Sequence, residues 1–491
     1  MRITSLFTIM IKTFIYTSVV CLFLVCKQEI KQKPNVLLLY MDDLRPELNC
    51  YGKTQIHSPN IDALASEGIL FENAYCNVPV CGASRASMLT GMYPTKNRFI
   101  NYNTFVTKEV PDAISLPKLF KNNGYTTISN GKVYHHVDDN IDDWDEIYRP
   151  YAFDQNEKNL APTDYWQTLW KDYQTPENRK TYKITNNGPA YEKANVNDTT
   201  YIDGLMTQKV LRDLKKLQKS KRPFFLTAGF ISNHLPFNAP EKYWNQYPSE
   251  SIKEPYNNTS QKNIPNIAIG NYHELRAYNN IPKTGEVDAI TSKELIHGYY
   301  ATVSYVDALI GKITSTLKNL DLDKNTIVIL VSDHGYILHE HAEWAKFTNH
   351  KIASQVPLII RAPKYKKGTV NSLVELVDLY PTLAELCGLE APLNQLEGKS
   401  FVSLLKDNEA ASKYFVFTKK GNGFTIKTPD YSYTEYINLK NGKKITSTLF
   451  DHNLDPDENT NISRDNQSKA IVSELSALLH QEFQSHISGI E

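Results

Sequence analysis

Three continuous apolar runs along the chain predict buried strands. They span residues 36–41, 224–231 and 326–332. A run of this length without polar interruption is typical of a strand buried on both faces of a parallel sheet. The first run ends in Asp42 and Asp43, the second leads towards His234, and the third ends in Asp333 and His334. Ligand sites in open α/β sheets lie at the carboxyl ends of the strands, so we expect these side chains to meet at one edge.

Segments with helical periodicity lie between the predicted strands. Tyr299–Asn319 places aliphatic residues at helical spacing, and Ser58–Gly68 begins with a capping serine and ends at a glycine. Further helices are expected at 115–123 and 205–217, with short strands at 126–129 and 356–360. This alternation predicts an α/β fold in which helices flank a large sheet.

Two regions depart from this alternation. Residues 144–201 are rich in aromatic and polar side chains with scattered Pro, Asn and Asp, so we expect a long irregular excursion that forms a pocket wall. From Lys413 onward short strands alternate with glycine turns, and an amphipathic helix is expected at 468–483. We therefore predict a main domain over residues 34–405 and a smaller α+β C-terminal subdomain over residues 412–491.

The first residues have the pattern of an export signal. An apolar run from Thr13 to Cys26 follows Arg2 and Lys12, and it is short for a membrane span. We expect residues 1–26 to be a signal peptide. Phe23–Cys26 resembles a loose bacterial lipobox, which implies a lipid anchor on Cys26, although simple cleavage stays open. In both cases we expect a bacterial protein of the periplasm or the outer-membrane surface, attached to a membrane only through lipid.

Composition limits the classes of partner and the covalent cross-links that we expect. The 491 residues include 54 basic and 54 acidic side chains, so no net charge steers the chain to nucleic acid. Of the six cysteines, two fall in the signal segment. The other four are too few for a dense disulfide framework, and a bridge between Cys50 and Cys76 stays open.

The stretch from Val80 to Gly91 carries the strongest chemical signal. Cys81 is followed by small residues and by Arg85, and then by a segment that favours a helix. A thiol at a helix N-terminus faces free N–H groups that favour an anion, and an arginine one turn on suits a tetrahedral oxyanion. The stretch therefore indicates a nucleophilic cysteine that faces a sulfate or phosphate. The alternative is a buried free thiol beside a surface arginine.

The segment Cys81–Arg85 resembles the signature of the type I formylglycine-dependent sulfatases, with Ala83 where proline is commoner. Other segments similar to that family are 35–43, 131–135, 332–335, 343–346 and 449–461. Those at 42–48, 131–135 and 341–346 resemble its iduronate-2-sulfatase branch most. The resemblance implies an alkaline-phosphatase-like fold, a large mixed sheet flanked by helices. It also implies a substrate such as ulvan or a glycosaminoglycan, sulfated polysaccharides or oligosaccharides that contain uronate.

The resemblance also implies a modified nucleophile and a metal ion. A sulfatase-maturating enzyme would oxidise Cys81 to formylglycine (3-oxoalanine). Asp42, Asp43, Asp333 and His334, with residue 81, would bind the metal. Carboxylate oxygens favour Ca²⁺, and the histidines and glutamates of 339–343 lack the spacing of a zinc motif.

The remaining site residues follow from the same resemblance. Arg85 and Lys132 would stabilise the nucleophile and the charge of the transferred group, and His135 would act as a base. His234 and Lys346 would bind sulfate, and His234 would protonate the leaving oxygen. Candidates for contact with the rest of the sugar, named for their position near these segments, are Arg98, His136 and His339.

Two other functions remain open at this point. A phosphodiesterase or phosphonate monoester hydrolase would share the same fold, because sulfate and phosphate esters have similar shapes. An exported glycan-binding lipoprotein with a decayed site is a non-enzymatic alternative. The presence of all the site residues favours an active enzyme.

Overall fold

The large sheet is built around β1 (Asn35–Met41), in which every residue is buried. β1 pairs in parallel with β7 (Phe224–Gly229) on one side and with β9 (Thr326–Ser332) on the other. The computed structural model describes residues 33–154, 165, 169, 172–270 and 273–489. The predicted signal segment lies outside the described residues. Residues 35–491 form one compact unit.

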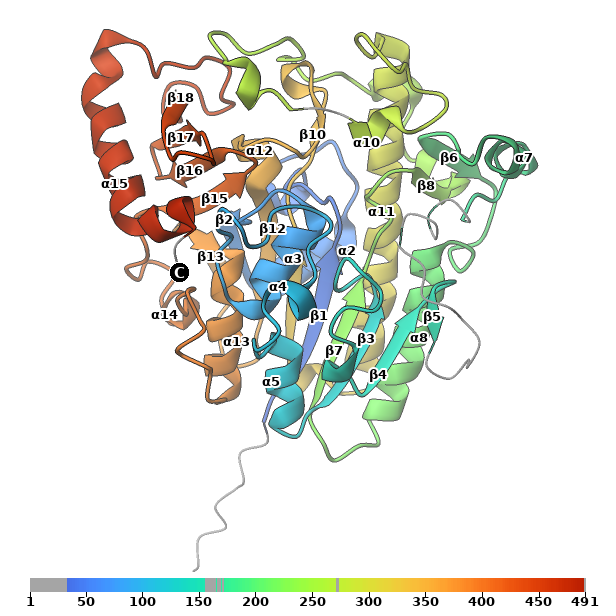
Figure 1. The fold of residues 1–491 in the computed structure, drawn as a ribbon. Coiled ribbons are helices and arrows are strands. Elements are labelled where there is room, and N and C mark those ends of the chain that lie inside the picture. Colours follow the sequence, from blue (N-terminus) through green and yellow to red (C-terminus); the bar gives the residue numbers. More distant parts are fainter. Residues whose placement is uncertain (1–32, 155–164, 166–168, 170–171, 271–272, 490–491) are drawn as a thin grey trace, which may run out of the picture. The chain divides into compact units, whose positions relative to one another are not determined.

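Ten strands make up this sheet, in the order β13-β2-β12-β9-β1-β7-β3-β4-β5, with β14 paired to β2 (Figure 1). The outer strands are β13 (Gly368–Val370), β2 (Ile69–Tyr75), β12 (Gln355–Arg361), β3 (Thr126–Gly131), β4 (Glu146–Arg149), β5 (Phe153–Asp154) and β14 (Val374–Glu375). β12 runs antiparallel to both of its neighbours, so the sheet is mixed, as the family resemblance implied.

Helices cover both faces of the sheet because its central strands are apolar on both sides. Leu37, Leu39 and Met41 of β1 face one core, and the alternate residues face the other. The first core includes α2 (Pro59–Glu67), α8 (Ile202–Leu217) and α11 (Ala289–Asn319). The second includes α3 (Cys81–Thr90), α5 (Leu116–Asn122), α13 (Leu379–Cys387) and α14 (Val402–Lys406).

Several of the remaining helices are short. They are η1 (Asn49–Tyr51), α4 (Val106–Glu109), η2 (Ile141–Asp143), α9 (Glu241–Trp244), η3 (Ser249–Ser251), η4 (Asn266–Ala268), α10 (His273–Arg276), η5 (Asp323–Asn325), η6 (Glu340–Ala342), α12 (Lys351–Ser354), η7 (Leu376–Asp378) and η8 (Asn466–Ser468). A two-stranded pair joins β10 (Ile337–Leu338) to β11 (Trp344–Ala345). No helix among the described residues is long and apolar enough to cross a membrane.

The predicted α/β class is confirmed, and two element predictions need correction. Helix α11 begins at Ala289 rather than at Tyr299, because Asp288 caps it by accepting from the N–H groups of Ile290 and Thr291. The excursion at 144–201 is more regular than expected. It contains β4, helix α7 (Pro176–Thr185) and β6 (Tyr191–Ala194), which pairs with β8 (Phe237–Pro240). Thr175 caps α7 ahead of Pro176, a start signal within a segment that otherwise lacks periodicity.

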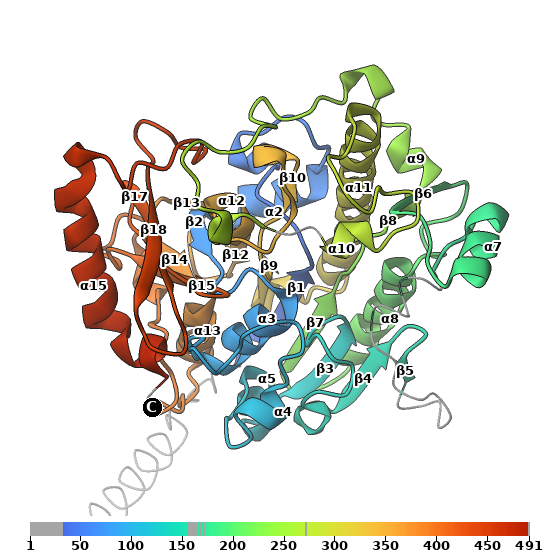
Figure 2. The same ribbon diagram turned by 45° about the horizontal axis from the view of Figure 1, so that its top comes forward.

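The C-terminal region is a four-stranded antiparallel sheet with one long helix, in the α+β arrangement that the sequence predicted. Strands β15 (Val416–Lys420), β16 (Gly423–Lys427), β17 (Tyr431–Ile437) and β18 (Lys444–Asp451) follow in chain order. Helix α15 (Lys469–Ser488) packs beside them through Leu479 and Phe483 (Figure 2). Cys50 and Cys76 are free thiols, so no disulfide joins them.

Candidate active site

Cys81 opens helix α3, whose ten residues are all buried. Its Sγ lies 3.3 Å from Nε2 of His334. Burial raises the pKa of the Cys81 thiol well above its ordinary value, although Lys132 and Lys346 act in the opposite direction. A thiol held in its protonated form is a poor nucleophile. The structure therefore places Cys81 at the centre of the site without activating it as a thiolate.

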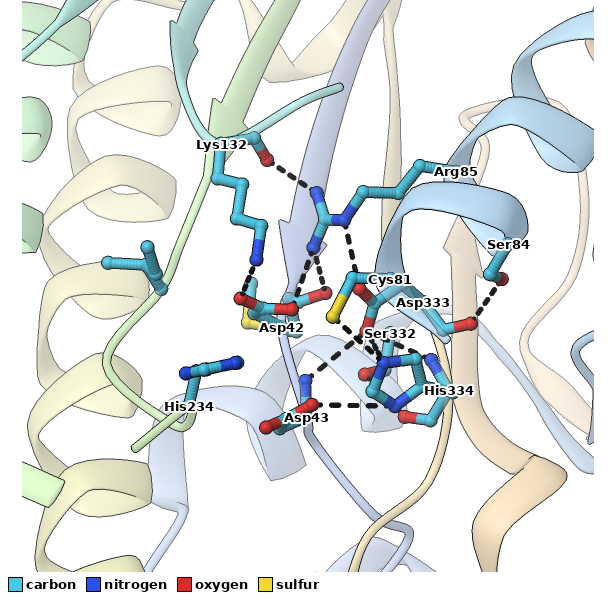
Figure 3. Close-up of polar contacts among 12 residues, drawn as sticks. Asp42, Asp43, Cys81, Ser84, Arg85, Lys132, His234, Ser332, Asp333 and His334 are labelled. Atoms are coloured by element: carbon cyan, nitrogen blue, oxygen red, sulfur yellow. Dashed lines mark hydrogen bonds and ion pairs between the residues drawn. The ribbon is translucent and has the colours of Figure 1, made fainter. Parts of the chain in front are cut away.

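Two strand ends bring the acidic residues to this thiol. In the register of β1 with β9, Met41 lies opposite Ser332, so the residues that follow each strand are neighbours. Asp43 adopts a left-handed conformation, with φ of 58°, and its N–H donates to Oδ1 of Asp333. Figure 3 shows Asp42 and Asp43 beside the Cys81 sulfur. The edge predicted from the apolar runs is confirmed.

These residues have the donor chemistry of a metal site. Ligand atoms of Asp42, Asp43, Cys81 and His334 lie within 4.8 Å of one another, and all four residues are buried. Asp333 is fully buried beside them, with Oδ1 3.6 Å from Nε2 of His334. Three buried carboxylates in one place suit a hard cation. The predicted ligand set therefore fits a metal ion.

Arg85 is fully buried and uses its N–H groups on the protein itself. It donates to Oδ2 of Asp333 at 2.9 Å, to a carboxylate oxygen of Asp42 and to the carbonyls of Met41, Lys132 and Val133. A guanidinium has five N–H donors, and these five contacts occupy them. Arg85 thus holds the carboxylates in position, and its predicted role at the nucleophile and the transferred group stays a prediction.

Two lysines face the carboxylates from the other side. Nζ of Lys132 donates to Oδ2 of Asp42 at 2.5 Å, and Nζ of Lys346 lies 3.0 Å from both oxygens of Asp43. Burial alone would raise the pKa of Asp42, but Lys132 and Arg85 hold it well below its usual range. The structure thus brings Lys132 and Lys346 to the site as predicted.

His234 completes this group. It lies on the segment after β7, and its ring is buried. Nδ1 pairs with the carbonyl of Leu235 at 2.6 Å, and Nε2 pairs with Glu274 at 2.8 Å. Burial and Lys346 lower the pKa of His234, but Glu274 and Asp43 outweigh them and raise it. A protonated His234 can donate a proton to a leaving oxygen.

A family model described as "Sulfatase" matches residues 34–389. The chain belongs to the sulfatase family. It is a sulfuric ester hydrolase. A second model, for the C-terminal part of N-sulphoglucosamine sulphohydrolase, matches residues 339–485.

Curated relatives extend this match over most of the chain. The sulfatase is 33% identical to human (Homo sapiens) iduronate 2-sulfatase over 421 residues, which cover 78% of this chain and 74% of the relative. It is 32% identical to a sulfatase of Formosa agariphila over 470 residues, covering 91% and 86%.

Solved structures share the fold. One, in complex with its substrate D-glucosamine-2-N,6-O-disulfate, has a TM-score of 0.73 at 22% identity and covers 94% of this chain and 99% of its own. The phosphonate monoester hydrolase of Agrobacterium radiobacter has a TM-score of 0.71 at 20% identity, covering 92% and 96%. At these identities both show the fold alone, and they confirm the predicted alkaline-phosphatase-like architecture of the sulfatase.

His135 and His136, which follow one another in the chain, differ in their contacts. His135 is largely buried, burial and Lys132 lower its pKa well below the usual range, and its Nδ1 has no hydrogen-bond partner among the described residues. A neutral ring with a free nitrogen fits the predicted base. The ring of His136 stacks on Phe105, with centroids 3.7 Å apart. The substrate contact of His136 stays a prediction.

Arg98 and His339 are engaged with other parts of the protein. Arg98 pairs with Glu397 at 2.8 Å and donates to the carbonyl of Tyr93. His339 adopts φ of 80°, and its Nδ1 lies 2.8 Å from Glu254 and 2.9 Å from the hydroxyl of Ser292. These contacts give both residues structural roles, and contact with substrate stays a prediction.

Glu274, which pairs with Lys346, and Lys420, which lies beside Phe347, carried no signal in the sequence. Glu274 comes from the short helix α10, far in sequence from Lys346, with which it pairs. Lys420 lies on β15, where its Nζ sits 5.6 Å from the ring centre of Phe347, the residue after Lys346. No carboxylate pairs with Lys420 among the residues that the structure describes, and burial lowers its pKa. Only folding brings these segments to the catalytic group.

Proposed function

We propose that this sulfatase hydrolyses sulfate esters on a sulfated, uronate-containing polysaccharide or oligosaccharide, with Cys81 matured to formylglycine and with Ca²⁺ as its metal. The observation that carries the proposal is the position of Cys81 Sγ, 3.3 Å from His334 and within the ligand set of Asp42 and Asp43.

Residue 81 as formylglycine would supply a hydrated aldehyde as nucleophile. Asp42, Asp43, Asp333 and His334 would hold Ca²⁺, which would supply a Lewis acid. Lys132 and Lys346 place two positive charges where a sulfate group would gather negative charge. His234 gives its Nε2 proton to the sugar oxygen that leaves, and His135 accepts a proton through its free Nδ1. Arg85 keeps Asp42 and Asp333 in place throughout.

Mass spectrometry of the peptide that contains Cys81, combined with release of sulfate from defined glycans, tests this proposal. We expect the mass of an aldehyde in place of the thiol, and sulfate release that the unmodified protein lacks. An active protein whose residue 81 is still cysteine would overturn the formylglycine assignment. Faster turnover of a phosphonate monoester than of every sulfate ester would favour the phosphonate monoester hydrolase activity of its structural relative.

The uronate part of the proposal rests on similarity to iduronate 2-sulfatase and on Lys420, which has no carboxylate partner among the described residues. A sugar carboxylate beside Phe347 would supply that partner. We expect Lys420→Met to raise KM for glycosaminoglycan or ulvan fragments by about tenfold, as the loss of one charged hydrogen bond predicts. It should leave KM for a sulfated galactoside that has no carboxylate unchanged. Lys440→Met, at an exposed lysine, is the control. Equal effects on both substrates would remove Lys420 from carboxylate recognition.

Export and maturation belong to the same proposal. The apolar run from Thr13 to Cys26 supports a signal peptide, and Phe23–Cys26 supports lipidation at Cys26. We propose that a sulfatase-maturating enzyme accepts the motif with Ala83, and that the mature protein is periplasmic or held at the cell surface by lipid. Fractionation of cells with Cys26→Ala beside wild type tests the anchor. A wild-type protein found only in the cytoplasm would contradict it.

A further inference from the structure

Glu274 shares the two groups that the proposed function assigns to the sulfate ester. Its carboxylate lies 3.0 Å from Nζ of Lys346 and 2.8 Å from Nε2 of His234. In the proposed reaction Lys346 binds the sulfate and His234 protonates the oxygen that links it to the sugar. A carboxylate bound to both would therefore lie near the ring carbons that flank the ester.

The backbone around Glu274 is anchored. Leu275 and Tyr278 are buried in the core that includes α11, and Arg276 donates to the carbonyls of Pro282 and Gly285. On the other side, the N–H of Gly270 donates to Glu343 at 3.0 Å. These contacts hold Glu274 at the site, where it would meet a bound substrate.

The charge around Glu274 is balanced before substrate arrives. Burial raises the pKa of Glu274, but Lys346 and His234 outweigh it and hold the carboxyl ionised. An incoming sulfate ester takes hydrogen bonds from the same two cations. The lone pairs of Glu274 are then open to a donor, such as a hydroxyl, on the sugar. A second sulfate at that point would meet a partly buried carboxylate whose cations are already shared, and like charges at such separations repel strongly.

We propose that Glu274 reads the substituent on the carbon next to the sulfate ester. It accepts a hydrogen bond from a free hydroxyl there and excludes a second sulfate. This inference rests on the proposed function, and it defines the substrate class further as sulfate esters with a neighbouring unsulfated hydroxyl.

Glu274→Gln tests the inference, because it keeps the shape of the side chain and removes its charge. The substrates are a terminal uronate disaccharide with a 2-sulfate and a free 3-hydroxyl, and its 2,3-disulfated counterpart. The wild type should prefer the free hydroxyl in kcat/KM by at least about thirtyfold, from like-charge repulsion in the site. In Glu274→Gln this preference should shrink by at least about tenfold, with part of the change a gain on the disulfated compound.

The control is Glu146→Gln. Glu146 is also a partly buried glutamate with two cationic partners, Lys209 at 2.5 Å and Lys216 at 3.1 Å, but it lies on β4. The Glu146→Gln variant should leave the preference for the free hydroxyl unchanged. If Glu274 only positions Lys346 and His234, Glu274→Gln will slow both substrates by the same factor, which overturns the inference. A wild type that favours the disulfated compound overturns it too. If the wild type desulfates neither compound nor any other glycan, the proposed function itself is wrong, and the inference that rests on it is overturned as well.

Discussion

Two of the clusters in which this protein buries carboxylates together with lysines differ in what completes their hydrogen bonds. In the catalytic cluster, Asp42 and Asp43 accept from the side chains of Lys132, Arg85 and Lys346. The second cluster, here called the Glu375 cluster, contains Glu375, Asp378, Lys413, Asn77 and Tyr93. There both carboxylates also accept from backbone N–H groups, including those of Phe417 and Lys399, as Asp333 does in the catalytic cluster but Asp42 and Asp43 do not among the described residues.

The catalytic cluster must exchange hydrogen-bond partners when a ligand binds, whereas the Glu375 cluster must keep its partners. Backbone N–H donors in the Glu375 cluster are fixed by η7 and β15, and Glu375 and Asp378 form a reciprocal capping box. Lysine side chains in the catalytic cluster can turn from a carboxylate to a bound sulfate without moving the backbone. The Glu375 cluster stabilises the junction of the two sheets, and the catalytic cluster holds positive charges ready for a ligand.

The largest effect is expected at the centre of the catalytic cluster. Cys81→Ala should lower sulfate release by at least about 10⁴-fold, as loss of a nucleophile does in other hydrolases. The melting temperature should stay close to that of wild type, because a small side chain is replaced at a helix start. Kinetics on the purified variant and a thermal scan check both. Residual turnover within about tenfold of wild type would show that residue 81 is not the nucleophile.

The Glu375 cluster should respond in the opposite way. Glu375→Ala removes an acceptor that Lys413, Asn77 and Tyr93 share, which should lower the free energy of unfolding by about 3–5 kcal/mol. Activity per folded molecule should be retained. Denaturant unfolding beside active-site titration measures the two quantities. As a control, Lys318→Ala removes an exposed pair with Glu67 and should change stability by less than about 1 kcal/mol. A stable but inactive Glu375→Ala would erase the distinction between the clusters.

Removal of the metal should affect both activity and stability through the catalytic cluster. Ca²⁺ at about one hundred times its Kd should stabilise the fold by about 2.7 kcal/mol, so chelation should lower the melting temperature and abolish turnover. Adding Ca²⁺ back should restore both. Asp42→Asn, which weakens the ligand set, should lose this response. Elemental analysis that finds zinc instead of calcium would contradict the hard-cation assignment.

Glu343 is a buried carboxylate outside both clusters. It differs from both in that no cation pairs with it among the described residues. Burial raises its pKa to about 7, and its one hydrogen-bond donor is the N–H of Gly270. The unfolded chain ionises this group at a lower pH, so stability should fall as pH rises from about 4.5 to about 7 and then level off. Glu343→Gln should remove up to roughly 3 kcal/mol of this fall. Unfolding at pH 5 and pH 8 measures it. An equal difference between variant and wild type at both pH values would contradict the raised pKa.

Much of the catalytic edge was already determined by the sequence. The apolar runs at 36–41 and 326–332 match β1 and β9, and the acidic residues that follow them meet because parallel strands end at a common edge. The segment Cys81–Arg85 predicted residue 81 as the nucleophile, since its small residues and arginine follow directly along one helix. Such signals lie within a few residues of one another, where periodicity and spacing report geometry directly.

Only the tertiary structure decided which partners surround that edge. Arg85 could be assigned to the substrate from sequence, but the fold directs it to Asp333, 248 positions away, and to three carbonyls. Glu274 and Lys420 sit in a short helix and in a C-terminal strand whose local sequences carry no chemical motif. Long-range contacts of this kind depend on how the two sheets and the connecting segments pack. No local spacing encodes them, because the free energy that fixes them comes from burial across the whole core.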